Sequence, residues 1–292
     1  MEELKEKEIK KFFQERNKES NKGDFGYVAI MGGCENYSGA IKLANISCSA
    51  IRAGCGVIRL IIPKAIVNSV SPYLLEQTIY SMPDNNSYMI FNKDEIDKAL
   101  DKIKALAIGM GWGQGKDNEK ILEYILKNYE IPIIIDADGL NTLAKMNLEI
   151  LNETRCKVIL TPHLKEFERI SKISIEEIKQ NPSKYAMEFA KKYNCIVLLK
   201  GSTTTVTNGN ETYLVKRGCP GMSTAGSGDV LSGILVGMLG YQKPEVLTIA
   251  TGAYLAGLAG ELAQDEKTDI SMIASDTVEK IPEAIKIIRN KS

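Results

Sequence analysis

Hydrophobic residues recur along this chain in short, nearly unbroken runs, each bounded by Gly, Pro, Asp or Asn. Runs of this length that are rich in β-branched residues are typical of strands buried on both faces of a parallel sheet. The pattern therefore predicts six such strands, over Tyr27–Met31, Val57–Ile62, Leu106–Ile108, Ile131–Ile135, Val158–Leu160 and Ile196–Leu199.

The stretches between these runs have apolar residues at helical spacing. They predict helices over Gly39–Ala53, Asn118–Asn128, Leu140–Met146, Pro182–Tyr193, Val230–Leu239 and Glu245–Ala263. Thr203–Thr207 and Thr212–Val215, joined through Asn208-Gly209-Asn210, predict an antiparallel hairpin. Strands that alternate with helices indicate right-handed crossovers. The predicted fold class is therefore α/β, with three αβα layers and a mostly parallel sheet that carries helices on both faces.

The N-terminal residues are dense in Lys and Glu, with only a ragged apolar stripe. They predict a short helix that docks through Phe12 and Phe13, followed by the polar linker Asn17–Lys22. No repeat, low-complexity stretch or shift in composition marks a second domain. We expect one domain over residues 1–292, in which residues 1–21 form an N-terminal helical extension and linker.

Composition and charge exclude several classes of protein. Hydrophobic residues make up 44% and charged residues 25% of the chain, which excludes wholesale disorder. Lys plus Arg and Asp plus Glu are 37 each, so the basic surplus of a phosphate-binding nucleic-acid protein is absent. Apolar runs such as Val230–Gly240 are too short and glycine-rich for a membrane span of about 20 residues. We expect a soluble cytoplasmic protein without nucleic-acid or membrane partners.

Cysteine spacing agrees with this compartment. The chain has six cysteines but no CxxC pair, so zinc-ribbon and redox spacings are absent. Most of them lie beside apolar residues, where cysteine usually acts as a small hydrophobic residue. Reduced structural thiols are predicted at Cys34, Cys48, Cys55, Cys156, Cys195 and Cys219.

Several predicted strands run directly into glycine or acidic residues. In an open parallel sheet, ligands bind at the carboxyl ends of the strands. Glycines also end strands for purely conformational reasons, so a single such turn would be weak evidence. Four turns of this kind predict one crevice; they are Gly32-Gly33, Gly109–Gly113, Asp136–Gly139 and Lys200-Gly201.

A glycine-dense run over residues 218–233 is the segment that indicates a ligand site most specifically. Gly226, Ser227 and Gly228 precede a helix that begins near Asp229, and the free N–H groups at such a helix start bind anions. Asp229 is either an ordinary acid of the first helical turn, worth about 1 kcal/mol, or a base beside the phosphate. We favour the base, because Lys200-Gly201 precedes this run. Neither GxxxxGK[ST] nor an early GxGxxG is present.

Five segments and a closing one carry a resemblance to a known family. They are Lys22–Gly26 with Gly32-Gly33 and Tyr37–Ala40; Gly109–Gly113; Asp136–Asn141; Thr161–Glu166; Lys200–Thr204 with Gly221–Gly233; and Ser271–Asp276. In this order they resemble the ADP/ATP-dependent NAD(P)H-hydrate dehydratases of the ribokinase-like superfamily. The resemblance covers about residues 22 to 287 and implies a ribokinase-like fold.

The resemblance implies a metabolite-repair reaction by a carbon–oxygen lyase. Hydrated NADH or NADPH is phosphorylated on the ring hydroxyl by ADP or ATP with Mg²⁺, and loss of phosphate restores the reduced cofactor. The His163 form of the motif favours ADP as the donor. The resemblance also implies a homo-oligomer such as a tetramer. The chain has no room for the epimerase domain that many bacterial members carry, so we expect a separate epimerase or spontaneous epimerisation.

The resemblance also implies roles for individual residues. Asp229 is the general base and contacts the hydrate. Glu166 is a candidate magnesium residue that acts through water. The remaining hydrate-site residues are Ala40, Gly111 and His163, and the nucleotide-binding residues are Lys200, Gly201, Ser202, Thr203, Thr204, Gly226, Ser227 and Gly228.

One local departure concerns the glycine turn after the third predicted strand. The family usually has GPGLG there, whereas Met110 and Trp112 interrupt the glycines of this chain. Trp112 is the single tryptophan, and it either stacks on a ligand ring or packs in the core.

Two other functions use the same features. A small-molecule kinase of the same superfamily, acting on a hydroxymethylpyrimidine, hydroxyethylthiazole or pyridoxal type of vitamin precursor, would need the same anion site and Asp229. A non-catalytic nucleotide sensor would not need a base beside the phosphate. The segments Thr161-Pro-His163 and Tyr37–Ala40 favour the dehydratase over the kinase.

Overall fold

The structure is a computed structural model that describes residues 2–49 and 52–290. Its main sheet has ten strands in the order β1-β12-β11-β10-β9-β8-β7-β2-β3-β4, and β11 alone runs antiparallel to its neighbours. β5 and β6 form a separate antiparallel pair. The strands are β1 (Glu2–Glu3), β2 (Tyr27–Met31), β3 (Val57–Pro63), β4 (Thr78–Met82), β5 (Asp84–Asn85), β6 (Tyr88–Met89), β7 (Ala105–Ile108), β8 (Ile133–Ile135), β9 (Val158–Leu160), β10 (Ile196–Leu199), β11 (Thr204–Thr207) and β12 (Thr212–Val215).

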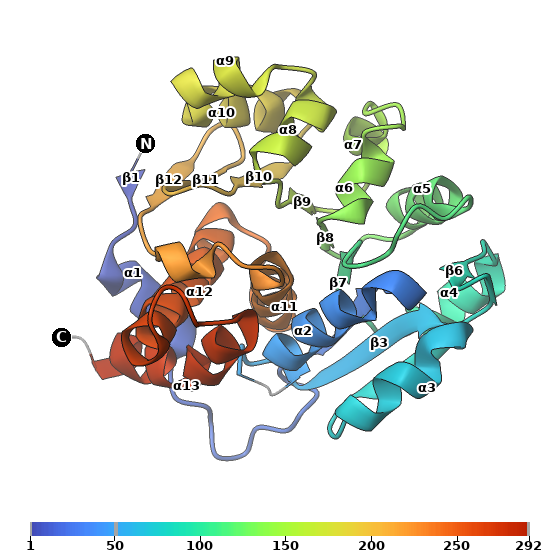
Figure 1. Cartoon of the computed structure of the whole chain (residues 1–292), viewed down its shortest axis with the longest axis horizontal. Helices are drawn as coiled ribbons and strands as arrows, with labels where there is room; N and C mark the ends of the chain where they lie inside the picture. Colours follow the sequence, from blue (N-terminus) through green and yellow to red (C-terminus); the bar gives the residue numbers. More distant parts are fainter. Residues whose placement is uncertain (1, 50–51, 291–292) are drawn as a thin grey trace.

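Helices cover both faces of this sheet (Figure 1). One face carries α1 (Glu6–Lys10), α2 (Ser38–Ser49), α3 (Val67–Val70), α11 (Ser227–Leu239), α12 (Val246–Lys267) and α13 (Ala274–Asn290). The other carries α4 (Lys93–Ala99), α5 (Asn118–Asn128), α6 (Asp138–Leu143), α7 (Ile150–Glu153), α8 (Leu164–Ser171), α9 (Ile175–Gln180) and α10 (Pro182–Lys192). Short 3₁₀ turns complete the chain at η1 (Lys11–Phe13), η2 (Glu35–Tyr37), η3 (Lys64–Ile66), η4 (Ser71–Tyr73) and η5 (Pro220–Met222).

Alternate residues of the central strands enter two separate apolar layers. In β2, Val28 and Ile30 join the layer formed with α2 and α11, whereas Ala29 and Met31 join the layer formed with α5 and α8. All four side chains are fully buried. Burial on both faces explains why the parallel strands are continuous hydrophobic runs in the sequence rather than alternating ones. The predicted three-layer α/β architecture is confirmed.

Element boundaries differ from the predictions at a few places. β8 begins at Ile133 rather than Ile131, because Pro132 has no N–H to donate to the ladder. α6 spans Asp138–Leu143 rather than Leu140–Met146, and the end predicted for α2 falls partly on residues 50 and 51, outside the described residues. α13 was missed although it is amphipathic, since Pro282 lies inside it.

Four described cysteines and the long apolar helix α12 lie in the core. Cys34, Cys55, Cys156, Cys195 and Cys219 are free thiols, whereas the side chain of Cys48 lies outside the described residues. Among the described residues, α12 alone is long and apolar enough to cross a membrane. Its most apolar window is 83% buried within the fold, as expected for a core helix.

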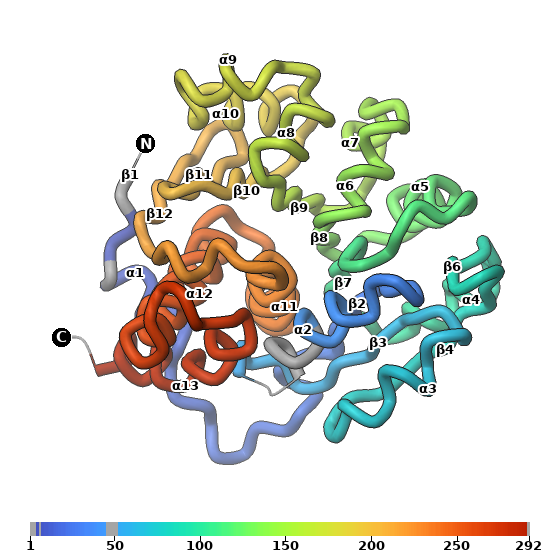
Figure 2. Tube along the Cα trace, viewed as in Figure 1, coloured from blue at the N-terminus to red at the C-terminus, as the bar shows by residue number. Residues whose placement is uncertain are grey.

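The N-terminal extension docks through its phenylalanines, as predicted, and the element it docks on is the C-terminal helix α13. Figure 2 shows this segment beside α13. Phe13 is only 4% exposed, and Phe12 packs half-buried against the same apolar layer. The Arg289 side chain donates hydrogen bonds to the carbonyls of Phe13 and Gln14, at 2.5 and 2.8 Å.

Phe13→Ala should lower the free energy of unfolding by about 3–5 kcal/mol, because it leaves a cavity in the core. Urea unfolding at neutral pH measures this loss. Phe12→Ala is the matched control and should have a smaller effect, since its ring is only half-buried. Equal small losses for both variants would show that the extension does not dock through Phe13.

Candidate active site

The turns at the carboxyl ends of neighbouring parallel strands are hydrogen-bonded to one another. The N–H of Gly33, after β2, donates to the carbonyl of Met110, after β7, at 2.9 Å. The N–H of Asp138 reaches back to Gly109, and the N–H of Lys200 donates to Pro162. These bonds join β2 to β7, β7 to β8 and β9 to β10, and the N–H of Thr161 joins β9 to β8 by donating to Ile135 at 3.3 Å, so the five strand ends form one continuous floor. The turns that the sequence predicts to line one crevice therefore lie together at this edge of the sheet.

Lys200 lies at the centre of this floor, immediately after β10. Its Nζ donates to Oδ1 of Asp136 at 3.0 Å and lies 3.9 Å from Oε2 of Glu166. A Cβ added to Gly228 would lie 3.4 Å from the same Nζ, so the ammonium faces the start of α11. Burial alone would lower the pKa of Lys200, but the charges of Asp136 and Glu166 raise it overall. Lys200 therefore stays positively charged.

The start of α11 has the geometry of an anion site. Gly226 precedes the helix with φ +95°, and a Cβ there would lie 2.4 Å from Cδ1 of Leu43. Only glycine fits both this backbone conformation and this contact. Ser227, Gly228 and Asp229 form the first turn of the 13-residue helix, where N–H groups lack helical acceptors and the positive end of the helix dipole lies.

Asp229 is placed in this first turn beside the lysine. Burial, together with the charge of Asp136, raises its pKa to about 7, and the charge of Lys200 opposes both effects. A carboxyl group with a pKa near neutrality can exchange a proton at the pH of the cell. The two features that the sequence suggested for this segment, an anion site and a base, are therefore adjacent.

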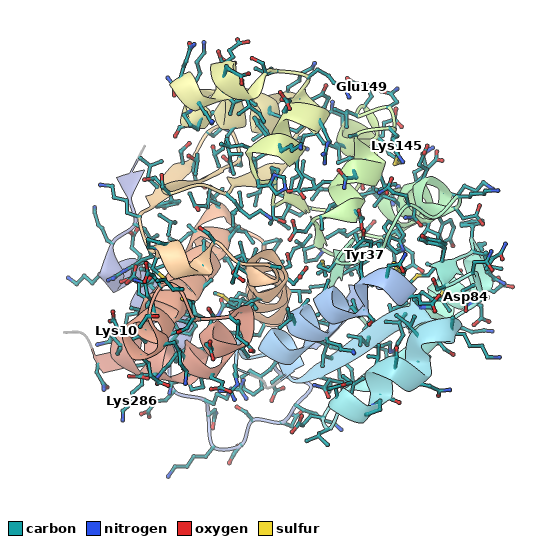
Figure 3. The ribbon with its side chains drawn as sticks, in the orientation of Figure 1. Lys10, Tyr37, Asp84, Lys145, Glu149 and Lys286 are labelled. Carbon is teal, nitrogen blue, oxygen red and sulfur yellow. The ribbon has the colours of Figure 1, made fainter. Side chains whose placement is uncertain are left out.

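The turn after β7 packs against the start of α2. A Cβ on Gly111 would lie 2.4 Å from the carbonyl oxygen of Tyr37 and 3.1 Å from Cβ of Ala40. A larger side chain at position 111 would therefore separate the two elements. Tyr37, labelled in Figure 3, is 58% exposed at this junction. Ala40 and Gly111 are in contact, as the sequence-based assignment of both to one site requires.

His163 and Glu166 begin α8 as a reciprocal cap. Nδ1 of His163 accepts the N–H groups of Lys165 and Glu166, at 3.1 and 3.2 Å, and Oε2 of Glu166 accepts the N–H of His163 at 2.9 Å. Nδ1 is thus occupied, and Nε2 lies 3.5 Å from Oε1 of the same Glu166, so both ring nitrogens face this cap. Burial and the charge of Lys200 lower the pKa of His163, so the ring is neutral at pH 7.

Glu166 is the carboxylate that could assist a magnesium ion. Its side chain is 8% exposed, and burial raises its pKa to about 7 against the influence of Lys200. Within residues 2–49 and 52–290, no three His, Cys, Asp or Glu side chains are arranged to hold a metal. The donor set therefore fits magnesium only if nucleotide phosphates and water supply most ligands, which is a common arrangement for this ion.

The nucleotide-binding residues predicted after Lys200 form an open loop into β11. Gly201, Ser202 and Thr203 are exposed, and the Thr204 hydroxyl donates to the carbonyl of Gly201 at 3.4 Å. This loop continues from the floor that carries Lys200. It is accessible from solvent, as a nucleotide-binding loop must be.

Three side chains in the site had been given no role from the sequence. Asp136 and Asp138 follow β8, and Ser232 lies one helical turn after Asp229. A pair of carboxylates directly after a buried strand was the available signal. Trp112, in contrast, is 1% exposed and packs in the core layer, so of its two interpretations core packing is correct.

Comparison with known sequences identifies relatives over most of the chain. A family model described as NAD(P)H-hydrate dehydratase matches residues 28–283. The ADP-dependent (S)-NAD(P)H-hydrate dehydratase of Nitrosopumilus maritimus is 31% identical over 286 residues, which are 95% of this chain and 94% of that protein. The chain spans about half the length, 50–52%, of bifunctional NAD(P)H-hydrate repair enzymes to which it is 30–34% identical.

Solved structures share the fold. A ribokinase-like superfamily protein from Enterococcus faecalis superimposes with a TM-score of 0.83 at 25% identity, covering 99% of this chain and 96% of that one. The ADP/ATP-dependent NAD(P)H-hydrate dehydratase of Bacillus subtilis, crystallised with ATP and Mg²⁺, gives 0.84 at 24% identity and covers 98% of each chain. The predicted ribokinase-like fold is confirmed.

The raised pKa of Asp229 predicts a pH-dependent stability. The folded protein holds a proton on Asp229 up to about pH 7, whereas the ordinary value is 3.8, so stability falls as pH rises through this interval. Asp229→Asn has no carboxyl group at this position, so it does not lose stability in this way as the pH rises. Its melting temperature should exceed that of the wild type at pH 8 by about 2–4 °C, corresponding to about 1 kcal/mol, and match it at pH 5. A variant less stable at pH 8 would show that Asp229 stabilises the fold as a charged cap.

Proposed function

The chain belongs to the NAD(P)H-hydrate dehydratase family, and we propose that it catalyses nucleotide-dependent dehydration of hydrated NADH or NADPH. One observation carries the proposal: a carboxyl group with a pKa near neutrality, Asp229, lies at a helix start that faces the ammonium of Lys200. Phosphoryl transfer to a hydroxyl needs such a base next to an anion site. The name of the Nitrosopumilus maritimus relative supports both the substrate and ADP as the donor.

In this proposal the nucleotide binds in the half of the site formed by the loop after β10 and the start of α11, which we call the nucleotide half. The loop from Lys200 to Thr204 holds the donor. The start of α11, at Gly226, Ser227 and Gly228, receives the phosphoryl group on its N–H groups. Lys200 supplies a fixed positive charge where negative charge accumulates on the transferred group. Without a side chain, Gly228 lets the phosphate approach the backbone closely.

The hydrate binds in the other half of the site, between Ala40, Gly111 and His163, which we call the hydrate half. Asp229 accepts the proton of the ring hydroxyl, and the hydroxyl oxygen attacks the terminal phosphorus of ADP, so that AMP leaves. The ring nitrogen then expels phosphate from the neighbouring carbon, and the adjacent carbon releases a proton to restore the dihydropyridine. Phosphorylation is necessary because hydroxide is a poor leaving group and phosphate is a good one.

A magnesium ion would be held by the nucleotide phosphates and by water, with Glu166 as the protein carboxylate. When bound, it would neutralise phosphate charge. Glu166 also keeps His163 in place, through the cap of α8 and through Oε1, which lies 3.5 Å from Nε2 of the ring.

Further properties follow from the family as proposals. We propose that the chain forms one catalytic domain, acts in the cytoplasm and assembles as a homo-oligomer such as a tetramer. Relatives that are bifunctional repair enzymes motivate a functional link to an NAD(P)H-hydrate epimerase. In that arrangement the epimerase converts the other epimer of the hydrate into the one that this site accepts.

Purified protein given hydrated NADH, ADP and magnesium should restore the near-ultraviolet absorbance of dihydronicotinamide, with one AMP and one phosphate per cofactor. ADP should also raise its melting temperature, since a ligand that binds only the folded state stabilises it. Phosphorylation of a vitamin precursor without recovery of absorbance would assign the protein to the kinases. An ADP-dependent melting shift without turnover of either substrate class would favour a sensor.

Asp229→Asn should lower turnover of hydrated NADH by about 10²–10⁴, the usual effect of losing a positioned base. The amide has the size of the carboxyl group, so the ADP-dependent melting shift should remain. Wild-type turnover in this variant would show that Asp229 is only a residue of the first helical turn.

A further inference from the structure

A strained turn after β8 lies between the two halves of the proposed site. The carbonyl of Asp136 accepts the N–H of Gly139 at 2.9 Å, which closes a four-residue turn. Ala137 occupies its second position with φ 50° and ψ −119°. A non-glycine residue in such a conformation costs about 1–3 kcal/mol and persists only where its surroundings hold it. The bonds on either side of Ala137 identify what holds it.

Before Ala137, the Asp136 carboxylate is directed to the nucleotide half. It is 1% exposed. Oδ1 accepts Nζ of Lys200 at 3.0 Å and the N–H of Ala137 at 2.9 Å, and Oδ2 accepts the Ser232 hydroxyl at 2.7 Å. Ser232 belongs to α11, the helix that begins at the anion site. Asp136 therefore connects the ammonium to the helix whose N–H groups would receive the phosphoryl group.

After Ala137, the Asp138 carboxylate is directed to the hydrate half. Oδ2 accepts the N–H of Gly113 at 2.8 Å, and Oδ1 accepts the side-chain amides of Gln114 and Asn141, both at 3.2 Å. The backbone N–H of Asp138 also donates to Gly109 at 3.2 Å. Both ends of the Gly109–Gly113 turn, which contains Gly111, are thus bonded to Asp138.

We propose that Asp136 and Asp138 are positioning residues with separable roles, Asp136 for Lys200 and the phosphoryl donor, Asp138 for the Gly111 turn and the hydrate. This inference rests on the proposed function. Neither carboxylate has to touch a substrate. Asp136 keeps the ammonium aligned with α11, and Asp138 keeps the Gly111 backbone against Tyr37 and Ala40.

Asp136→Asn keeps the size of the side chain and removes the charge that holds Lys200. We expect kcat for hydrated NADH to fall by about 10–100-fold, because a misplacement of about 1 Å in a reacting site has effects of this size. The ADP-dependent melting shift should shrink, whereas KM for the hydrate should stay close to that of the wild type. Ser232→Ala removes one bond to Asp136 and should act in the same direction with a smaller effect.

Asp138→Ala removes the acceptor for the Gly113 N–H. We expect KM for the hydrate to rise about tenfold, as for the loss of a hydrogen bond to a charged group. The ADP-dependent melting shift should be unchanged. Asp138→Asn should restore much of the affinity, since its amide oxygen can still accept the Gly113 N–H. A merely structural role for Asp138 would not produce this split between KM and nucleotide binding.

Asp97→Asn is the matched control. Asp97 is a carboxylate on α4, outside the site, that accepts bonds from Lys93, Tyr124 and Tyr129 at 2.6–2.9 Å. Its replacement should lower the melting temperature of the free protein but leave kcat, KM and the ADP-dependent shift unchanged. It therefore measures what the loss of a bonded carboxylate does to stability alone.

The proposal is overturned if Asp136→Asn and Asp138→Ala change kcat and KM in the same proportion, or if both behave like Asp97→Asn. If Asp136→Asn does not fold, Ser232→Ala decides the first role. If the wild type does not turn over hydrated NADH, the proposed function fails, yet the ADP-dependent shift still tests the division. In that case the proposed division is supported if Asp136→Asn reduces the ADP-dependent melting shift and Asp138→Ala leaves it unchanged. It is overturned if the two variants show the same shift.

Discussion

The ion pair between Lys200 and Asp136 is the interaction on which the site depends. Asp136 is almost fully buried and Lys200 largely so, and neither charge could remain there alone. A buried pair of this kind contributes little net stability, because desolvation offsets the attraction, but removal of one partner leaves an uncompensated charge. The two apolar layers stabilise the fold. The ion pair instead fixes the position of the Lys200 ammonium relative to α11.

Burial has opposite consequences for stability and for chemistry at the neighbouring carboxyl groups. It raises the pKa values of both Asp229 and Glu166 to about 7. Folding therefore becomes less favourable as these groups lose their protons. The same shift places Asp229 in the range where a base is effective at neutral pH. A fully exposed aspartate would stabilise the helix start better and would be a weaker base.

The buried parallel strands from β2 to β10, apart from the edge strands, and the start of α11 could be predicted from the sequence because both depend on local patterns. Continuous apolar runs mark strands with two buried faces, and the glycines around Gly226 mark a helix start. The roles of Asp136 and Ser232 could not be predicted, because they depend on a contact between residues 96 positions apart. α8 was missed for a different reason: its capping residue is His163, which is not among the usual N-cap residues.

The packing of α2 against α11 fixes the positions of residues from both halves of the proposed site. Ala40 lies near the start of α2 and Asp229 near the start of α11, and Leu43 of α2 packs against Gly226 at the head of α11. Two constraints therefore require glycine at position 226: the left-handed backbone before α11, and the close packing with α2. Because well-packed helices resist deformation, this contact sets the separation between Ala40, in the proposed hydrate site, and Asp229, the proposed base. The turn at Ala137 does the same for Lys200 and the Gly111 turn through backbone and carboxylate bonds, so both halves of the proposed site are fixed by the core.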